Sequence, residues 1–588
     1  MLLSKVILRG FRNFKNAEIN LSEKALVIGP NDIGKTNLIW AIRLLLDRSL
    51  TDIDREPRDG DFYALEETNE FQIRLEFTDI TEECVRAKMK EKISGEGGMF
   101  IVYKAIRDPA TRAKTHSIFV GPDMDSLEGI EDRYYLRVLN VNYIGSRRDF
   151  YRFIDFEKAR LLQDTKEARD DDQIEADQKL EVEIAESITI VDEKIPQLTY
   201  VADATKSINE ELSKLSIKND NHSIVFDAIS SDINTFIESV SLSAKSEGRS
   251  LTIGGDGRLN QIYLCLWAGR HTKTIEELEQ VSIVCIEEPE AHLHPHQQRK
   301  LADYLNRSLS GQVLMTSHSP QITAEFSPNA IVRLLQKREG TVAASQGCSE
   351  IIDAAFQDFG YRMSIIPAEA FFADLVLLVE GPSEEQFYKT LAKQIEIDLD
   401  GLNVSILMIS GIGFGVFTKI LSSLEIDWMM RTDNDIFKIP KQETYQFAGI
   451  RRVISSYDNS PLSTDAITEI VDAVQEQFYN LPSPEPSAEV LAAAGELMTQ
   501  LNPLGFFLSE VDLETDMFES PIKEDLIAFY DGIAEADIIN EMKKSKAISM
   551  FDFLKSHKES LGKLADHPLA HPLVSCRDRI QNLRNGVH

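Results

Sequence analysis

The stretch Val281-Ser-Ile-Val-Cys-Ile-Glu-Glu-Pro-Glu-Ala-His-Leu-His-Pro295 decides the fold. Its apolar half, Val281–Ile286, has the continuous hydrophobic pattern of a strand buried in a parallel sheet. Glu287 and Glu288 follow directly, and Pro289 ends the strand. Such strand ends are where open α/β sheets bind ligands, and two adjacent buried carboxylates repel each other unless a metal or a reacting water compensates them. We therefore expect half of a nucleotide site here; a strand that ends in solvated acids is the alternative.

The other half lies upstream, in Gly29-Pro-Asn-Asp-Ile-Gly-Lys-Thr36, which has the spacing GxxxxGKT. A predicted strand, Ala25–Ile28, precedes it and a predicted helix, Asn37–Leu46, follows it, which is the context that a phosphate-binding loop requires. In such loops backbone N–H groups surround the β-phosphate, the lysine reaches the β- and γ-phosphates, and the hydroxyl ligates Mg²⁺. The residues that we expect to hold the nucleotide are Asn31, Gly34, Lys35, Thr36 and Glu287.

The bulk composition limits the class of protein. A chain of 588 residues is too long for one core, so we expect two to four domains. The net charge of −33 argues against a protein that merely coats DNA, which would be basic, but not against a metal-dependent nuclease. Five scattered cysteines exclude a disulfide framework and suit a reducing cytosol. No apolar run approaches ~18 residues, so we expect a cytoplasmic protein without membrane contact.

The segment 155–246 separates the two halves of the nucleotide site. It contains helical patterns with a single apolar stripe, for example Ile208, Leu212 and Leu215, and a second stripe from Phe226 to Val240. Such a stripe either folds back on its own domain or meets a partner subunit. Because the segment interrupts the site, we expect it to serve dimerisation.

Another buried strand, within Gly311–Pro320, ends at His318. If this strand lies beside the one that carries Glu287 and Glu288, His318 can sense the γ-phosphate or hold the attacking water. A histidine satisfied within the core is the alternative. The glycine-containing loop Leu251–Asn260 is expected either to bind a second anion or to be an ordinary turn.

A second set of carboxylates follows further predicted strands. Leu375–Val379 ends at Glu380, and Ile426–Thr432 ends in Asp433-Asn-Asp435; Glu384 lies in the first turn of the helix after Glu380. Parallel strands bring their carboxyl ends to one sheet edge, and no matching bases are near these acids in the sequence. The cluster therefore needs hard divalent cations, Mg²⁺ or Mn²⁺, and two such ions can align a water and a leaving oxygen on phosphate.

These motifs resemble two known modules. The nucleotide motifs resemble an ABC-type ATPase head, and the pattern Glu-Gly-x-x-Glu followed by Asp-x-Asp resembles a Toprim domain. Together in one chain they resemble the OLD (overcoming lysogenization defect) family of nucleases, with specific motifs from Met1 to about Asp435. The resemblance implies an ATP-linked, metal-dependent DNA endonuclease of antiphage defence. It makes Glu287 the carboxylate on the Mg²⁺ side and Glu288 the general base for water.

The family also has a late acidic site and a lysine. Phe506–Glu514, a strand-like run, offers Glu510, Asp512 and Glu514, and the best lysine is Lys546, with Lys543, Lys544 and Lys563 as rivals. A lysine there can stabilise charge on the phosphate. The expected catalytic residues are Glu288, His318, Glu380, Asp433 and Lys546. The expected metal ligands are Glu380, Glu384, Asp433, Asp435, Asp512 and Glu514.

We therefore expect an α/β protein in which an ABC-type ATPase head with a helical insert precedes a Toprim domain with helical additions. The expected segments are 1–154, 155–246, 247–367 and 368–588, the last with a helical insert near 440–501. The expected partners are ATP, Mg²⁺ or Mn²⁺, DNA, and further copies of the chain in a homodimer or higher homo-oligomer. Two alternatives stay open: an ATP-dependent DNA clamp or sensor, and a nuclease active only with an operon-encoded partner such as a helicase-like protein or a retron DNA–reverse transcriptase complex.

Overall fold

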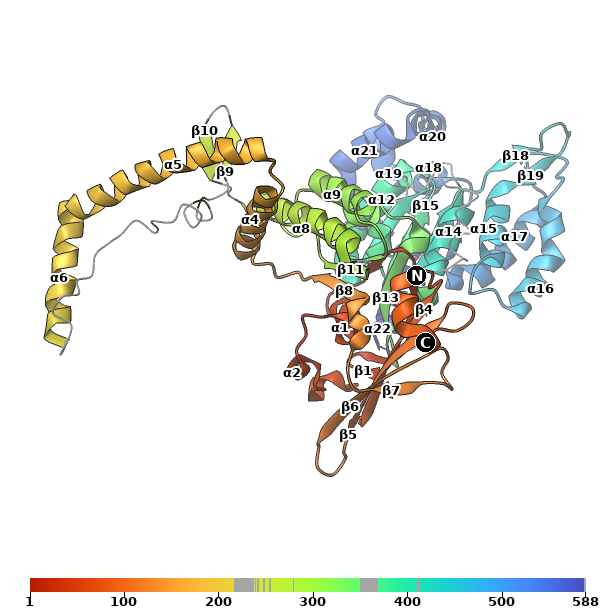
Figure 1. Ribbon diagram of the computed structural model, residues 1–588. Helices are drawn as coiled ribbons and strands as arrows, with labels where there is room; N and C mark the ends of the chain where they lie inside the picture. The colour runs from red at the N-terminus through yellow and green to blue at the C-terminus, as the bar shows by residue number, and fades with distance from the viewer. Residues whose placement is uncertain are drawn as a thin grey trace. The chain divides into compact units, whose positions relative to one another are not determined.

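The structure is a computed structural model (Figure 1). It describes residues 1–215, 237, 240, 243–246, 249–252, 255–278, 280–348, 368–409 and 413–585. The chain forms two compact units. One consists of Met1–Ser146, Ile275–Glu290 and His294–His588, and the other of Arg147–Thr274 with Ala291–Leu293. No helix in the described ranges is both long enough and apolar enough to cross a membrane.

The larger unit contains a twelve-stranded sheet with the order β7-β6-β5-β4-β1-β2-β14-β13-β3-β12-β11-β8. The strands are β1 Leu2–Phe11, β2 Phe14–Asn20, β3 Lys24–Ile28, β4 Glu70–Thr78, β5 Met99–Arg107, β6 Lys114–Gly121, β7 Glu128–Ile130, β8 Leu139–Ile144, β11 Val281–Glu287, β12 Val313–Thr316, β13 Ile331–Lys337 and β14 Gly340–Ala343. Pairing is antiparallel from β7 to β13 and parallel from β13 to β8. The prediction of a buried strand in a parallel sheet is therefore confirmed for β11, which lies between β12 and β8.

Helix α1, Lys35–Leu46, follows β3 and buries its apolar side against this sheet. It begins two residues before the predicted start at Asn37. The reason is Gly34, whose φ of 110° turns the chain into the helix, so that the amide of Leu38 already donates to the carbonyl of Gly34 at 2.9 Å. The phosphate-loop lysine and threonine consequently stand in the first helical turn.

A second sheet in the same unit has the order β16-β15-β17-β20, and all its pairs are parallel. Its strands are β15 Leu375–Val379, β16 Val404–Met408, β17 Asp427–Thr432 and β20 Phe506–Leu508. The helices around it are α12 Pro382–Gln394, α13 Leu399–Leu402, α14 Phe414–Ser423, α18 Leu513–Phe518, α19 Lys523–Phe529, α20 Glu535–Lys544, α21 Lys546–His557 and α22 His571–Asn585. The predicted α/β class is confirmed for both sheets.

The strand-like run predicted over Phe506–Glu514 is wrong beyond Leu508. Asp512 caps a helix instead, because its side chain accepts a hydrogen bond from the amide of Thr515 at 2.9 Å. The segment 440–501 is helical as expected, with α15 Ala448–Asp458, α16 Asp465–Val474 and α17 Ala488–Leu501. A short hairpin, β18 Ile436–Lys438 and β19 Tyr445–Phe447, precedes these helices.

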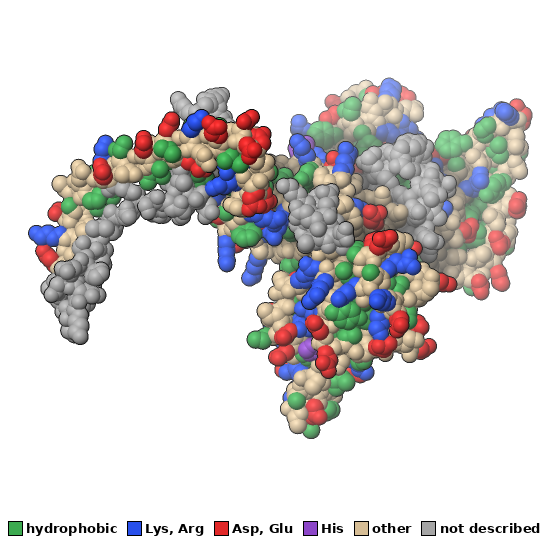
Figure 2. Space-filling view, in the orientation of Figure 1, with side chains coloured by type: hydrophobic (Ala, Val, Ile, Leu, Met, Phe, Trp, Pro, Cys, Tyr) green, Lys and Arg blue, Asp and Glu red, His purple; other side chains and the backbone are tan. Residues whose placement is uncertain are grey.

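The smaller unit is mainly helical, with α4 Phe150–Glu167, α5 Asp171–Lys194, α6 Thr199–Leu215, the hairpin β9 Ser243–Ser246 and β10 Arg249–Thr252, and most of α8 Asp256–Leu278. Acidic, basic and apolar side chains alternate along the surface of α5 (Figure 2). The stripe predicted from Phe226 to Val240 lies almost entirely outside the described residues, as does the centre of the loop Leu251–Asn260. Helices thus dominate the part of the segment 155–246 that is described.

Candidate active sites

The glycine loop between β3 and α1 positions Lys35. The side chain is buried, and its Nζ donates to the carbonyls of Gly29 and Pro30 at 2.8 Å each. Burial lowers the pKa of Lys35 to about 8, although nearby carboxylates, first Glu288, act in the opposite direction. The ammonium is therefore held by the loop itself, at the place where such loops receive phosphate.

The carboxyl end of β11 lies beside this loop. The hydroxyl of Thr36 donates to Oε2 of Glu287 at 3.4 Å. Burial raises the pKa of Glu287, while hydrogen bonds from Tyr143 and Thr36 lower it. Thr36 and Glu287, the two residues expected on the Mg²⁺ side of a nucleotide, are thus brought together.

Glu288 and His318 come together at the ends of neighbouring parallel strands, β11 and β12. His318 Nε2 lies 3.6 Å from Glu288 Oε1. Burial and then the charge of Lys35 lower the pKa of His318, so the imidazole is neutral near pH 7. A neutral imidazole beside a carboxylate can hold and orient a water molecule.

Glu290 is a residue of this site whose role sequence reasoning missed. Its Oε1 accepts hydrogen bonds from the Ser317 hydroxyl at 2.7 Å and from the amide of His318 at 2.8 Å. It thereby ties the loop after β11 to the loop that carries His318. The only signal in the sequence was its place in the Glu-Glu-Pro-Glu run, because the partner residues lie 27 and 28 positions away.

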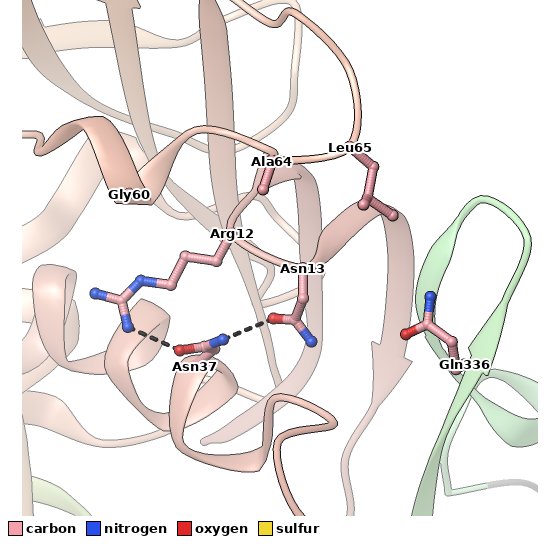
Figure 3. Close-up of a pocket in the computed structure, with 7 residues that line it drawn as sticks. All are labelled: Arg12, Asn13, Asn37, Gly60, Ala64, Leu65 and Gln336. Carbon is pink, nitrogen blue, oxygen red and sulfur yellow. Dashed lines mark hydrogen bonds between the residues drawn. The ribbon is translucent and has the colours of Figure 1, made fainter.

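A cavity of about 490 Å³ lies at the start of α1, beside the glycine loop, and was not predicted from the sequence (Figure 3). Its lining residues are Arg12, Asn13, Asn37, Gly60, Ala64, Leu65 and Gln336. Arg12 donates to Asn37 at 2.8 Å, and Asn37 donates to Asn13 at 2.7 Å. Asn37 directly follows Thr36, so this polar chain borders the nucleotide loop. Arg12 and Asn13 form the connection between β1 and β2.

Asn31 is exposed and lines a different groove of about 1350 Å³, together with Asp32 from the loop and with Asp374 and Trp428 near the second sheet. Gly34 acts through the backbone, as the residue before α1.

The second acidic group forms where β15 and β17 end side by side. Glu380 Oε1 accepts hydrogen bonds from the Thr432 hydroxyl and from the amide of Asp433, the latter at 2.9 Å. Asp433 is buried, and its Oδ1 accepts from the hydroxyl of Ser509 at 3.1 Å. The parallel pairing of β15 with β17 therefore places Glu380 against Asp433, as parallel strand ends predict.

Two further predicted acids and the preferred lysine reach the same place. Lys546 Nζ lies 3.1 Å from Glu514 Oε2 and 3.7 Å from Asp433 Oδ2. Burial acts to lower the pKa of Lys546, but Glu514 and Asp433 together outweigh it and raise that pKa. Burial, and next the charge of Asp433, raise the pKa of Glu384. We name Glu380, Glu384, Asp433, Asp435, Glu514 and Lys546 the acidic centre.

The rival lysines stand elsewhere. Lys563 pairs with Asp525 at 2.5 Å, and Lys544 pairs with Glu541. Lys543 reaches Asp512 at 2.6 Å, so this predicted ligand is already paired with a cation while it caps α18.

The expectation that the acids have no matching bases is wrong. Arg431 is buried, and its guanidinium lies 3.5 Å from Asp433 Oδ1 and 3.0 Å from Asp516 Oδ2. Arg452 faces the acidic centre too, where it contacts Glu380 at 2.9 Å. In the sequence these arginines appear beside or after the acids with no sign of their partners, because only the folded sheet and α15 bring them in.

The acidic centre has the donor atoms of a divalent-cation site but is not arranged as one. Among the described residues, no group of three or more Asp, Glu, His or Cys side chains is arranged to hold a metal ion. Glu514, however, is 1% exposed, and its Oε1 has no hydrogen-bond partner among the described residues, while Lys546 Nζ lies 3.1 Å from its Oε2. A buried carboxylate in this condition needs further compensation, and carboxylate oxygens are the ligands that Mg²⁺ and Mn²⁺ prefer. These carboxylates fit a divalent cation once the arginine and lysine side chains that pair with them move away.

The chain is similar to known proteins over most of its length. The family model "Overcoming lysogenization defect protein-like, TOPRIM domain" matches residues 371–435, and the model "AAA ATPase domain" matches residues 1–119 and 140–323. "Endonuclease GajA" of Bacillus cereus is 23% identical over 573 residues, which cover 95% of each chain. "OLD nuclease" of Thermus scotoductus is 23% identical over 464 residues, 75% of this chain and 83% of that one. The solved C-terminal region of the Xanthomonas campestris OLD protein is 19% identical and covers 37% of this chain and 100% of its own, with a TM-score of 0.23.

Proposed function

We propose that this chain, which belongs to the AAA ATPase domain family and matches the OLD-like Toprim model over residues 371–435, is an ATP-dependent, divalent-metal-dependent DNA endonuclease of the OLD family in antiphage defence. The observation that carries the proposal is the meeting of Glu380, Asp433 and Lys546, which come from three separate parts of the sequence. We propose that the enzyme acts in the cytoplasm.

In this proposal the acidic centre cuts the phosphodiester. Glu380, Glu384, Asp433, Asp435 and Glu514 provide the carboxylate oxygens for Mg²⁺ or Mn²⁺, and Asp512 joins them only when Lys543 turns away. A divalent cation held by these carboxylates would activate a water and neutralise the leaving oxygen. Lys546 stabilises the negative charge that builds on the phosphate, because its ammonium stands beside Asp433 and Glu514.

The nucleotide site sets the state in which cutting occurs. Lys35 exchanges its loop carbonyls for the β- and γ-phosphates of ATP, and Thr36 and Glu287 hold its Mg²⁺. Glu288 acts as the base for water, and His318 orients that water. We further propose the domain boundaries 1–154, 155–246, 247–367 and 368–588, with the second segment joining two copies of the chain.

The test uses supercoiled plasmid with Mg²⁺ or Mn²⁺, in the presence and absence of ATP. We expect wild-type protein to nick or linearise the plasmid and Glu380→Ala to cut at least about 100-fold more slowly, because a ligand of the metal is lost. Glu385→Ala is the matched control: Glu385 lies on α12 beside Glu384 but pairs with Lys389 at 2.5 Å. Glu380→Ala should bind ATP normally, whereas Lys35→Ala should not.

Cutting by Glu380→Ala at the wild-type rate would remove Glu380 from the centre. Absence of cutting by wild-type protein in every lane would favour a nuclease that needs a partner, such as a helicase-like protein or a retron DNA–reverse transcriptase complex. Purification of the protein with whatever it carries would then follow.

A further inference from the structure

The guanidinium of Arg452 stands among the oxygens of the acidic centre. Its Nη2 lies 2.9 Å from Glu380 Oε1, 3.0 Å from Asp435 Oδ2 and 2.7 Å from the carbonyl oxygen of Asp433. One organic cation thus binds three residues that follow the ends of β15 and β17. Two of its contacts are the side chains of proposed metal ligands.

The fold holds Arg452 in this position. Helix α15 begins against the segment Asp433–Asp435, since the amides of Ala448 and Gly449 donate to the carbonyl of Asp435 at 2.8 and 3.3 Å. A Cβ added to Gly449 would stand 2.6 Å from Cα of Asn434, so only glycine permits this close approach. Arg452, three residues later, lies on the same helical face and turns back to the acids.

The contacts fill one oxygen of Glu380. Its Oε1 receives the Thr432 hydroxyl, the amide of Asp433 and the guanidinium of Arg452. Each carboxylate oxygen has about two lone-pair positions, so no room for a cation remains on this atom. Asp435 Oδ2 is likewise engaged by Arg452. This pairing agrees with the lack, among the described residues, of three acids ready to hold a metal ion.

We propose that Arg452 is an internal counter-ion of the acidic centre that competes with divalent cations. While the guanidinium stays in place, Glu380 Oε1 and Asp435 Oδ2 are not open to a divalent cation, so Arg452 sets the metal concentration at which the centre is filled. The inference rests on the proposed nuclease function, because it concerns the same residues.

A role for Arg452 in positioning the carboxylates predicts the opposite change in metal affinity. If the guanidinium only holds the two carboxylates in a ligating arrangement, its removal weakens metal binding. If it competes with the metal, its removal strengthens metal binding. The sign of the change in affinity separates the two roles, and it can be measured without any DNA or turnover.

The experiment measures Mn²⁺ binding to the full-length protein by the electron paramagnetic resonance signal of free Mn²⁺. We expect Arg452→Gln to lower the dissociation constant of the tightest Toprim site about tenfold, a size typical of changes next to metal ligands. Arg451→Gln is the matched control, because it removes the same charge from the same helix. Arg451 bonds Gln446 and stacks 3.9 Å from the ring centroid of Tyr479 instead. We expect it to change the constant less than twofold.

An unchanged or weaker affinity in Arg452→Gln, with Arg451→Gln behaving as wild type, would overturn the inference and leave the nuclease proposal standing. Asp433→Asn separates the two failures: if wild type and Asp433→Asn bind Mn²⁺ equally, the metal site itself is absent and the proposed function fails. Glu287→Gln supplies the background without the nucleotide-site metal, because Glu287 is a proposed ligand of that ion.

Loss of the counter-ion also affects the metal-free protein. In EDTA we expect Arg452→Gln to melt earlier than Arg451→Gln, because Glu380 and Asp435 lose their cation, and Mn²⁺ to restore more of the loss than it does in the control. If Arg452→Gln does not fold, Arg452→Met takes its place, since methionine removes the charge but keeps an unbranched side chain. A tighter Mn²⁺ constant in Arg452→Met supports the inference, and an unchanged or weaker one overturns it.

Discussion

At the scale of single residues, Glu290 links the two strand ends that carry Glu288 and His318. It gives one oxygen to both the Ser317 hydroxyl and the amide of His318. We predict that Glu290→Ala lowers the free energy of unfolding by about 1–3 kcal/mol, because two donors lose their acceptor inside the site. We also predict slower ATP turnover at nearly unchanged ATP affinity, since Glu290 positions His318.

Melting curves and ATPase assays check this prediction. Asp303→Ala is the control, because Asp303 makes a partly exposed pair with Arg307 within α9, Pro295–Ser308, and should change neither quantity. Equal ATP turnover in Glu290→Ala and wild type would show that the loop of His318 is positioned without Glu290.

Some residues of the candidate sites can be predicted from the local sequence pattern, and others cannot. Glu380 and Asp433 follow apolar runs, and the ends of parallel strands meet at one edge, so local pattern predicts their proximity. Arg452 has no such signal: its place depends on how α15 begins against Asp435, which is a contact between separate elements. Local pattern therefore predicts the acids of the centre, whereas the cations that balance them follow from packing.

At the scale of elements, β13 connects the two sheets of the larger unit. Arg333 on β13 is buried, and it donates to the carbonyls of Leu424 at 3.1 Å, Glu425 at 2.9 Å and Ala373 at 2.9 Å. These carbonyls precede β17 and β15, the strands that end at the acidic centre. Because β13 pairs with β3, which leads into the nucleotide loop, Arg333 joins the strands of both sites.

We predict that Arg333→Met lowers the free energy of unfolding by about 3 kcal/mol, because three buried carbonyls lose a charged donor. We also predict that any effect of ATP on plasmid cutting weakens more than the basal rate does. Lys337→Ala is the control: Lys337 lies on the same strand and pairs with Glu425, but it is half exposed, so about 0.5 kcal/mol or less is expected. Denaturant unfolding that gives equal losses for both variants would contradict the prediction.

The observed element boundaries match the predicted ones where the hydrophobic pattern decides them. They differ from the predicted ones where a helix cap decides them. The strand β11 agrees with its apolar run to within one residue. The helix α1 starts early because Gly34 turns the chain, and the run after Leu508 becomes a cap and a helix because Asp512 accepts from Thr515. A cap depends on one side chain and one amide, which an average over hydrophobicity does not resolve.

At the scale of the whole molecule, the net charge of −33 bears on how the proposed DNA substrate can bind. Long-range repulsion of phosphate is strong at low salt, so association with DNA depends on local cations and on bound metal. The same charge opposes self-association, so any dimer must rest on apolar contact. Helix α5 offers such a contact: Leu180, Ile184 and Val191 are 56%, 37% and 49% exposed, and their spacing places them on one helical face.

We predict that the triple variant Leu180→Ser, Ile184→Ser, Val191→Ser weakens the proposed homodimer about 100-fold or more, since each apolar side chain that becomes buried contributes about 1 kcal/mol or more. Light scattering after size exclusion measures the mass over a range of concentrations. Val182→Ser with Ile190→Ser is the matched control, because these residues are 59% and 53% exposed on the same helix but lie off the stripe. A control that dissociates as readily as the triple variant would show that α5 contributes no specific face, and a dimer that survives in both variants would move the interface to another part of the chain.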